Sequence, residues 1–293
     1  MNEKSLYLIS KLRIKELLIF VSFAWFFVIV LQLVMAMNRI TYQLIDEIGI
    51  MIWYCFAPFL WIYVNSRKES VSLRNFFCSI NTNGIKENNF AKYVLAGIIY
   101  CIFQVSIMNI ATLLLATIDP VFATNETLER IEKARDMFSS SNYITSTIIF
   151  INTVIIVPFV EELLFRGVIL NKLHNKVSLL KAVIFCSILF GVIHIKGVIT
   201  AIIFGILMSL LYIRTKSLTG PVICHMINNL FLSLEKPITK LIFNVEYKSI
   251  AIYEQLFLFS LAGCIITFSI IVYFVLSSRK YLVNIQNRET IMK

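Results

Sequence analysis

The sequence predicts an all-α membrane protein, a polytopic helical bundle with about eight transmembrane helices in one domain, residues 1–293. Hydrophobic residues make up 58% of the chain and charged residues only 15%, and the mean hydropathy is +0.81. Soluble domains rarely exceed about half apolar residues. The apolar residues also form long continuous blocks, which suit helices, whereas the strands of a membrane barrel would alternate apolar and polar residues. No linker rich in Gly, Pro or Ser divides the chain.

Each apolar block is expected to form one helix, because a transmembrane helix needs about 20 mainly apolar residues, with a range of roughly 17–25. The eight blocks cover residues 17–37, 48–64, 93–118, 143–160, 179–195, 197–213, 218–234 and 256–276. The fifth and sixth blocks are joined almost without a loop, so a different boundary there would change the count by one.

The distribution of charge predicts the orientation of the chain in the membrane. With eight spans and a cytoplasmic N-terminus, 19 of the 27 Lys and Arg residues fall in inside segments, which are 1–16, 65–92, 161–181, 214–217 and 277–293. The outside segments hold 10 of the 17 acidic residues. This bias predicts that both termini are cytoplasmic. We expect the protein to lie in the cell (plasma) membrane. The net charge of +10 is thereby explained by topology, and no nucleic-acid partner is expected.

Two polar stretches interrupt the blocks. Segment 65–92 mixes basic and apolar residues, so we expect a cytoplasmic loop that lies along the membrane interface. Segment 119–142 is expected to be an external loop or a short helix.

The stretch "PFVEELLFRG" places Glu161, Glu162 and Arg166 among apolar residues. A charged side chain at the bilayer centre costs about 2.5–3.5 kcal/mol and usually faces a cavity or a partner. We expect the helix of the fourth block to continue from about 143 to 172, which puts Glu162 and Arg166 four residues apart on one face, able to pair. Glu161 then points about 100° away, free for other work. The alternative is that all three are solvated at the cytoplasmic interface.

Two histidines favour a shared polar site. His194 and His225 lie within apolar blocks, whereas the third histidine, His174, lies in a polar loop and is expected to be solvated. Phe190 and His194 are four residues apart, and so are His225 and Asn229. On a helix each pair presents one face, and we expect these faces to meet the glutamates.

The chemistry that this set predicts is hydrolysis. Glu161 and His194 could hold and deprotonate a water molecule, while His225 and Asn229 could donate hydrogen bonds to the oxyanion of a scissile carbonyl. No Ser or Cys is placed beside a histidine as a covalent nucleophile would be, and no HExxH motif occurs. Glu161, His194 and His225 would also supply the three protein ligands of a catalytic zinc. Whether these residues bind Zn²⁺ or only orient a water stays open.

Three motifs carry a resemblance to a known family. "EELLFR" (161–166), "FGVIH" (190–194) and "HMINN" (225–229) resemble the EExxxR, FxxxH and HxxxN motifs of the CAAX prenyl protease and bacteriocin-processing family, also called CPBP or Abi. The resemblance covers about 140–235, the expected catalytic core. It implies an eight-helix intramembrane endopeptidase, often called a metalloprotease. Glu161 and His194 would then activate water, His225 and Asn229 would form the oxyanion site, and Glu162 with Arg166 would support it.

Two other functions compete with this one. A non-catalytic membrane protein of the same family, such as a bacteriocin immunity protein or a scaffold, would not need Glu161. A proton-coupled transporter would also place Glu and His in the membrane, but we find no pair of matching broken hydrophobic segments in two halves of the chain. The expected partners are the lipid bilayer and a peptide or membrane-protein substrate.

Overall fold

The structure is a computed structural model that describes residues 11–37, 49, 51–72, 90–123, 125, 143–194, 197–243 and 254–291. In these ranges every regular element is a helix and no strand occurs, so the predicted all-α class is confirmed. The elements in chain order are α2 (Ile14–Met37), η1 (Met51–Phe56), α4 (Ala57–Lys68), α6 (Phe90–Ile118), α8 (Tyr143–Ile151), η3 (Asn152–Ile156), α9 (Val157–Glu162), η4 (Leu163–Leu170), α10 (Asn171–His174), α11 (Leu179–Val192), α12 (Val198–Thr215), α13 (Thr219–Phe243) and α15 (Phe257–Ile291).

Five stretches of the described chain are long and apolar enough to cross a membrane. They are Lys15–Val34, Phe90–Ile118, Ser146–His174, Val198–Thr215 and Phe257–Arg279. The other three predicted spans also fold as helices. The block 179–195 forms α11, which is apolar but only 14 residues long, and the blocks 48–64 and 218–234 contribute to η1–α4 and α13. The polytopic bundle is confirmed, and the count of eight spans stays a prediction.

The predicted loops fall mostly beyond the parts of the chain that the structure describes. Segment 65–92 is described only to residue 72 and again from residue 90, and segment 119–142 only at 119–123 and 125. Their predicted roles as a cytoplasmic loop and an external segment therefore stay predictions.

The site is built on one continuous helical rod from residue 143 to residue 174. As the sequence predicted, the fourth block runs straight on through the acidic motif, from α8 through η3, α9 and η4 to α10. Two stretches of the rod, η3 and η4, are π-helical, with wider turns than an α-helix. Such turns are rare and occur often at functional sites. Pro158 lies in the first turn of α9, where its missing N–H is tolerated.

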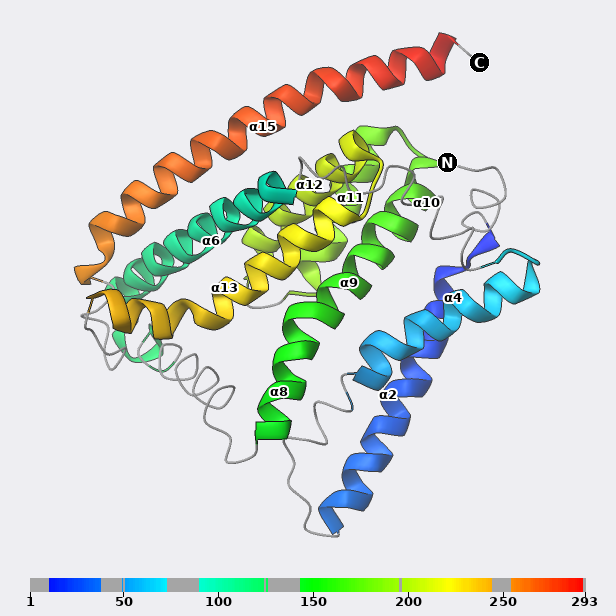
Figure 1. Ribbon diagram of the computed structural model, residues 1–293, viewed down its shortest axis with the longest axis horizontal. Helices are drawn as coiled ribbons and strands as arrows, with labels where there is room; N and C mark the ends of the chain where they lie inside the picture. The colour runs from blue at the N-terminus through cyan, green and yellow to red at the C-terminus, as the bar shows by residue number, and fades with distance from the viewer. Residues whose placement is uncertain are drawn as a thin grey trace.

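The remaining helices surround this rod. Figure 1 shows α15, α6 and α13 on one side of α8–α9 and the pair α2 and α4 on the other. Helices α11 and α12 pack closely where Gly205 faces Ser187. A Cβ atom added to Gly205 would lie only 2.9 Å from the Cα atom of Ser187. The outer faces carry large exposed apolar side chains, among them Phe23, Leu258 and Tyr273. This surface suits contact with lipid.

Candidate active site

The centre of the site is a fully buried ion pair on the rod. Arg166 Nη1 donates a hydrogen bond to Glu162 Oε1 at 2.8 Å, and neither side chain is exposed to solvent. This is the contact that the four-residue spacing predicts. Arg166 Nη2 donates to the carbonyl oxygen of Gly205 at 3.2 Å, and the guanidinium lies 4.7 Å from the centre of the Phe190 ring. The rod is thus tied to α11 and α12 through one arginine.

His225 joins the two glutamates. Its Nδ1 atom lies 2.9 Å from Glu162 Oε1, and its Nε2 atom lies 3.6 Å from Glu161 Oε2. The ring comes from α13 and is buried. Because successive residues of a helix diverge by about 100°, the two carboxylates approach different edges of the same imidazole. Glu161 therefore faces the Nε2 edge of the His225 ring, while Glu162 faces the Nδ1 edge.

His194 approaches Glu161 from another helix. It follows the end of α11 at Val192, and its Nδ1 atom lies 2.7 Å from the carbonyl oxygen of Phe190. Because a carbonyl oxygen only accepts hydrogen bonds, Nδ1 carries the proton. The Nε2 atom lies 3.9 Å from Glu161 Oε1. The His194 side chain is 36% exposed, whereas that of Glu161 is 4% exposed, so the site is open to solvent at His194.

Aromatic rings enclose the imidazoles. The predicted Phe190 lies with its ring centre 4.5 Å from that of His194 and 6.0 Å from that of His225. Phe204 of α12 lies closer to His225, at 4.7 Å between ring centres. No sequence pattern distinguished Phe204, because it is one apolar residue in an apolar block. These rings form an apolar side of the polar cluster.

Asn229 is connected to the rod. Its Nδ2 atom donates to the carbonyl oxygen of Thr153 at 3.0 Å, in the π-helical segment η3. The neighbouring Asn228 is buried, and its Nδ2 atom lies 3.5 Å from Asn229 Oδ1. Asn229 thus lies on the helix that carries His225, next to the segment that precedes Glu161. Its predicted hydrogen bond to an oxyanion stays a prediction.

The sequence also predicted a zinc site made by Glu161, His194 and His225. The Nε2 atoms of both histidines face the carboxylate of Glu161. The Nδ1 atom of each histidine lies within hydrogen-bond distance of an oxygen atom, an arrangement that is common for metal-binding histidines. Nitrogen and oxygen donors of this kind are of the right type for zinc. However, within the described ranges no group of three or more His, Cys, Asp or Glu side chains is placed to hold a metal ion. Zinc therefore stays a prediction.

Comparison with known proteins supports the predicted family over the segment that carries the site. Residues 143–231 match the family model described as type II CAAX prenyl endopeptidase Rce1-like. The chain is also 32% identical over 79 residues to "Putative membrane peptidase YdiL" of Bacillus subtilis (strain 168). That alignment covers 26% of this chain, and the chain spans about a third (32%) of the length of that relative. No solved structure gives a significant match.

The matched segment contains all the predicted site residues, from Glu161 to Asn229. The family resemblance that the three motifs indicated is therefore confirmed for this segment. Together with the apolar helices, the match identifies an integral membrane protein with a segment similar to a membrane-protease family.

Proposed function

We propose that this protein is an intramembrane endopeptidase that hydrolyses a peptide bond of a membrane-associated protein or peptide. One observation carries the proposal. Two imidazoles from different helices turn their Nε2 atoms toward the same buried carboxylate, Glu161, at 3.6 and 3.9 Å. Buried ionisable groups in a membrane protein are costly and usually functional. The match of residues 143–231 to a peptidase family supports the same reaction class.

The spacing around Glu161 suits a water molecule. Separations of 3.6 and 3.9 Å are too long for direct hydrogen bonds, and polar groups at such distances are commonly bridged by water. With its proton on Nδ1, a neutral His194 presents the lone pair of Nε2 to that water. Glu161 and His194 would thus orient one water from two sides, at the edge where a substrate can enter.

Hydrolysis would then proceed through a general base. Glu161 takes a proton from the water, whose oxygen attacks the carbonyl carbon of the scissile bond. The C–N bond breaks, and Glu161 returns the proton to the leaving amine nitrogen. His225 and Asn229 would donate hydrogen bonds to the oxyanion formed on the way. For His225 to donate to the oxyanion through Nε2 and to Glu162 through Nδ1, both of its ring nitrogens must carry a proton. Two carboxylates and one guanidinium leave a single negative charge, which that imidazolium balances.

Glu162 and Arg166 would act as positioning residues. The hydrogen bond between Glu162 and His225 Nδ1 fixes the rotation of the imidazole, and Arg166 in turn fixes Glu162. Neither group has to touch the substrate. Charge-assisted hydrogen bonds of this kind are about twice as strong as neutral ones, which suits them to hold a catalytic ring in one orientation.

In the alternative mechanism His225 would be neutral, and its Nε2 atom would bind zinc instead of donating to an oxyanion. A zinc ion held by Glu161, His194 and His225 would act as a Lewis acid and activate water at neutral pH. Measuring the zinc content of the purified protein and of a His225→Ala variant tests this ligand set without any activity assay. Loss of one equivalent of zinc in the variant would support it. The same zinc content in both proteins would exclude it.

The experiment that tests the proposed function compares the peptides released from membranes that contain the wild-type protein, Glu161→Ala or His194→Ala at matched protein levels. Glu254→Gln is the matched control, because Glu254 is an exposed carboxylate outside the site. We expect at least one peptide to be absent with both site variants and present with the control. Identical peptide patterns, with any cellular phenotype retained, would instead favour the non-catalytic immunity or scaffold function.

A further inference from the structure

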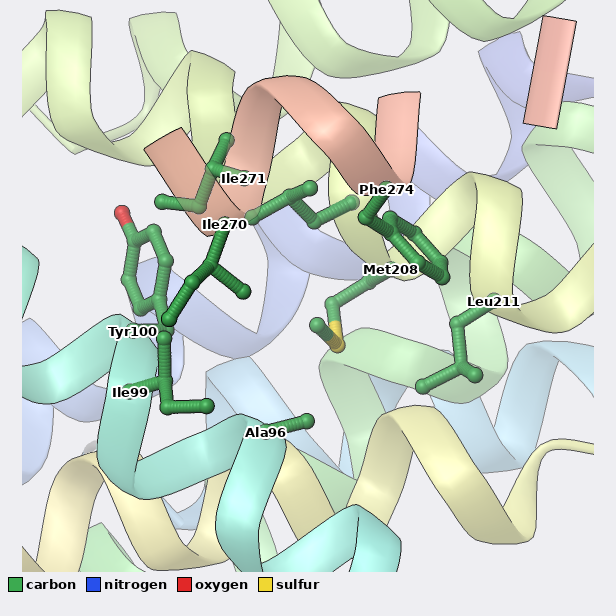
Figure 2. A pocket seen from close by; sticks show the side chains of 9 residues that line it. Ala96, Ile99, Tyr100, Met208, Leu211, Ile270, Ile271 and Phe274 are labelled. Carbon is green, nitrogen blue, oxygen red and sulfur yellow. The ribbon is translucent and has the colours of Figure 1, made fainter. Parts of the chain in front are cut away.

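A second feature lies outside the polar cluster. A cavity of about 120 Å³ opens between α6, α12 and α15, three of the helices that are apolar enough to cross a membrane. Figure 2 shows Ala96 and Tyr100 of α6, Met208 and Leu211 of α12, and Ile271 and Phe274 of α15 around it. The hydroxyl group of Tyr100 donates to the carbonyl oxygen of Thr200, so its one polar group is engaged. The cavity therefore offers an almost purely apolar surface.

An arginine lies beside this cavity. Arg214, in the last turn of α12, places its guanidinium 5.2 Å from the centre of the Phe274 ring, which lines the cavity. Its Nη1 atom donates to the hydroxyl oxygens of Ser277 and Ser278, both at 3.2 Å. The side chain of Arg214 is exposed. A cation and two hydroxyl groups thus stand together next to the apolar space.

At the end of the bundle near Arg214, the membrane-spanning parts of these three helices carry only positive charge. The span of α6 begins at Phe90, the span of α12 ends at Thr215, and the span of α15 ends at Arg279. Lys92, Arg214 and Arg279 lie at these ends, and Lys216 follows α12 in a left-handed conformation that stops the helix. The segments 90–118, 198–217 and 257–282 contain no Asp or Glu. The charge bias of the sequence predicts that all three ends lie at the cytoplasmic face.

We propose that this cavity binds one acyl chain of an anionic phospholipid, with the lipid phosphate at Arg214. The apolar lining matches a hydrocarbon chain, and the guanidinium matches a phosphate, which arginine binds with directed hydrogen bonds. Basic pockets between transmembrane helices on the cytoplasmic side are a recurring type of lipid site. The apolar space and the guanidinium lie next to each other, because Phe274 lines the cavity and its ring also lies beside Arg214. This lipid site does not depend on peptidase activity.

The test measures lipid binding to the purified full-length protein by native mass spectrometry. The probes are phosphatidylglycerol and phosphatidylcholine with the same acyl chains, so that only the head group differs. Arg214→Gln removes the predicted phosphate ligand. Arg67→Gln is the matched control, since it removes one exposed positive charge from the last turn of α4, away from the cavity. Ala96→Phe places a ring in the cavity.

We expect the wild-type protein to bind phosphatidylglycerol more tightly than phosphatidylcholine. A basic residue at an anionic membrane surface changes affinity about fivefold, so Arg214→Gln should weaken phosphatidylglycerol binding about fivefold and leave phosphatidylcholine binding unchanged. Ala96→Phe should weaken the binding of both lipids, and Arg67→Gln neither. Equal affinity of the wild-type protein for both lipids, or equal losses in Arg214→Gln and Arg67→Gln, would overturn the proposal. Full binding by a folded Ala96→Phe variant would also overturn it.

Discussion

The buried pair of Glu162 and Arg166 makes a prediction about stability that the structure quantifies. Replacing Arg166 with Met removes the hydrogen bonds to Glu162 and to the carbonyl oxygen of Gly205. It also leaves the carboxylate of Glu162 fully buried without its guanidinium. Breaking such a pair by removing one partner costs about 3–5 kcal/mol. We expect Arg166→Met to lower the free energy of unfolding by that amount.

Removing both charges should undo much of this loss. A double variant, Glu162→Gln with Arg166→Met, leaves no uncompensated charge, and replacing a whole buried pair with neutral groups is often close to neutral. The amide oxygen of the glutamine can still accept the hydrogen bond from His225 Nδ1. The double variant should therefore be about 3 kcal/mol more stable than Arg166→Met alone.

The free energy of unfolding can be measured by reversible denaturation in mixed micelles for the wild-type protein, both single variants and the double variant. The cycle gives the coupling between the two side chains. If the effects of the two single variants simply add, the pair is not coupled and the reasoning from its burial is wrong. The same conclusion follows if Arg166→Met costs less than about 1 kcal/mol, the upper range for an exposed pair.

Three further predictions concern helix packing. Gly205→Ala should destabilise the protein by about 1–3 kcal/mol in the same denaturation assay, because the new Cβ atom would meet the backbone of α11 at 2.9 Å, and a variant as stable as the wild type would contradict this. Asn109→Ala removes a 3.2 Å hydrogen bond to Ser260 and should lower the free energy of unfolding by only about 0.6 kcal/mol, the average for a polar contact between membrane helices. A loss above about 2 kcal/mol would refute that estimate. Tyr100→Phe should cost about 1 kcal/mol, since it removes the buried hydrogen bond from the tyrosine hydroxyl to the carbonyl oxygen of Thr200. No measurable loss would show that this bond is not needed.

The contacts that the sequence predicted were those set by helix periodicity. Glu162 and Arg166 meet because residues four apart share a helix face, and the rod continues through the acidic motif because no residue there ends a helix. The approach of His194 and His225 to Glu161 could be anticipated in kind, because polar groups buried in a membrane protein must find partners. The distances between them could not.

The features that sequence reasoning missed depend on how the helices pack. The π-helical turns in η3 and η4 change which residues share a face of the rod, and no pattern in the sequence predicted them. Phe204 and the carbonyl oxygen of Gly205 enter the site because α12 approaches the rod and α11 closely. A backbone carbonyl has no sequence signal at all. The number of spans also depends on packing, since α11 is apolar but has only 14 residues.

The most direct test of the proposed mechanism is the rate of peptide-bond cleavage by the purified protein in lipid vesicles, using a substrate found by the comparison of released peptides. Glu161→Gln keeps the size of the side chain and removes the base, while Glu254→Gln removes an exposed carboxylate elsewhere. General-base catalysis contributes about 10²–10⁴-fold, so the cleavage rate of Glu161→Gln should fall by that factor and that of Glu254→Gln should not change. A Glu161→Gln variant that cleaves within about twofold of the wild-type rate would contradict water activation by Glu161.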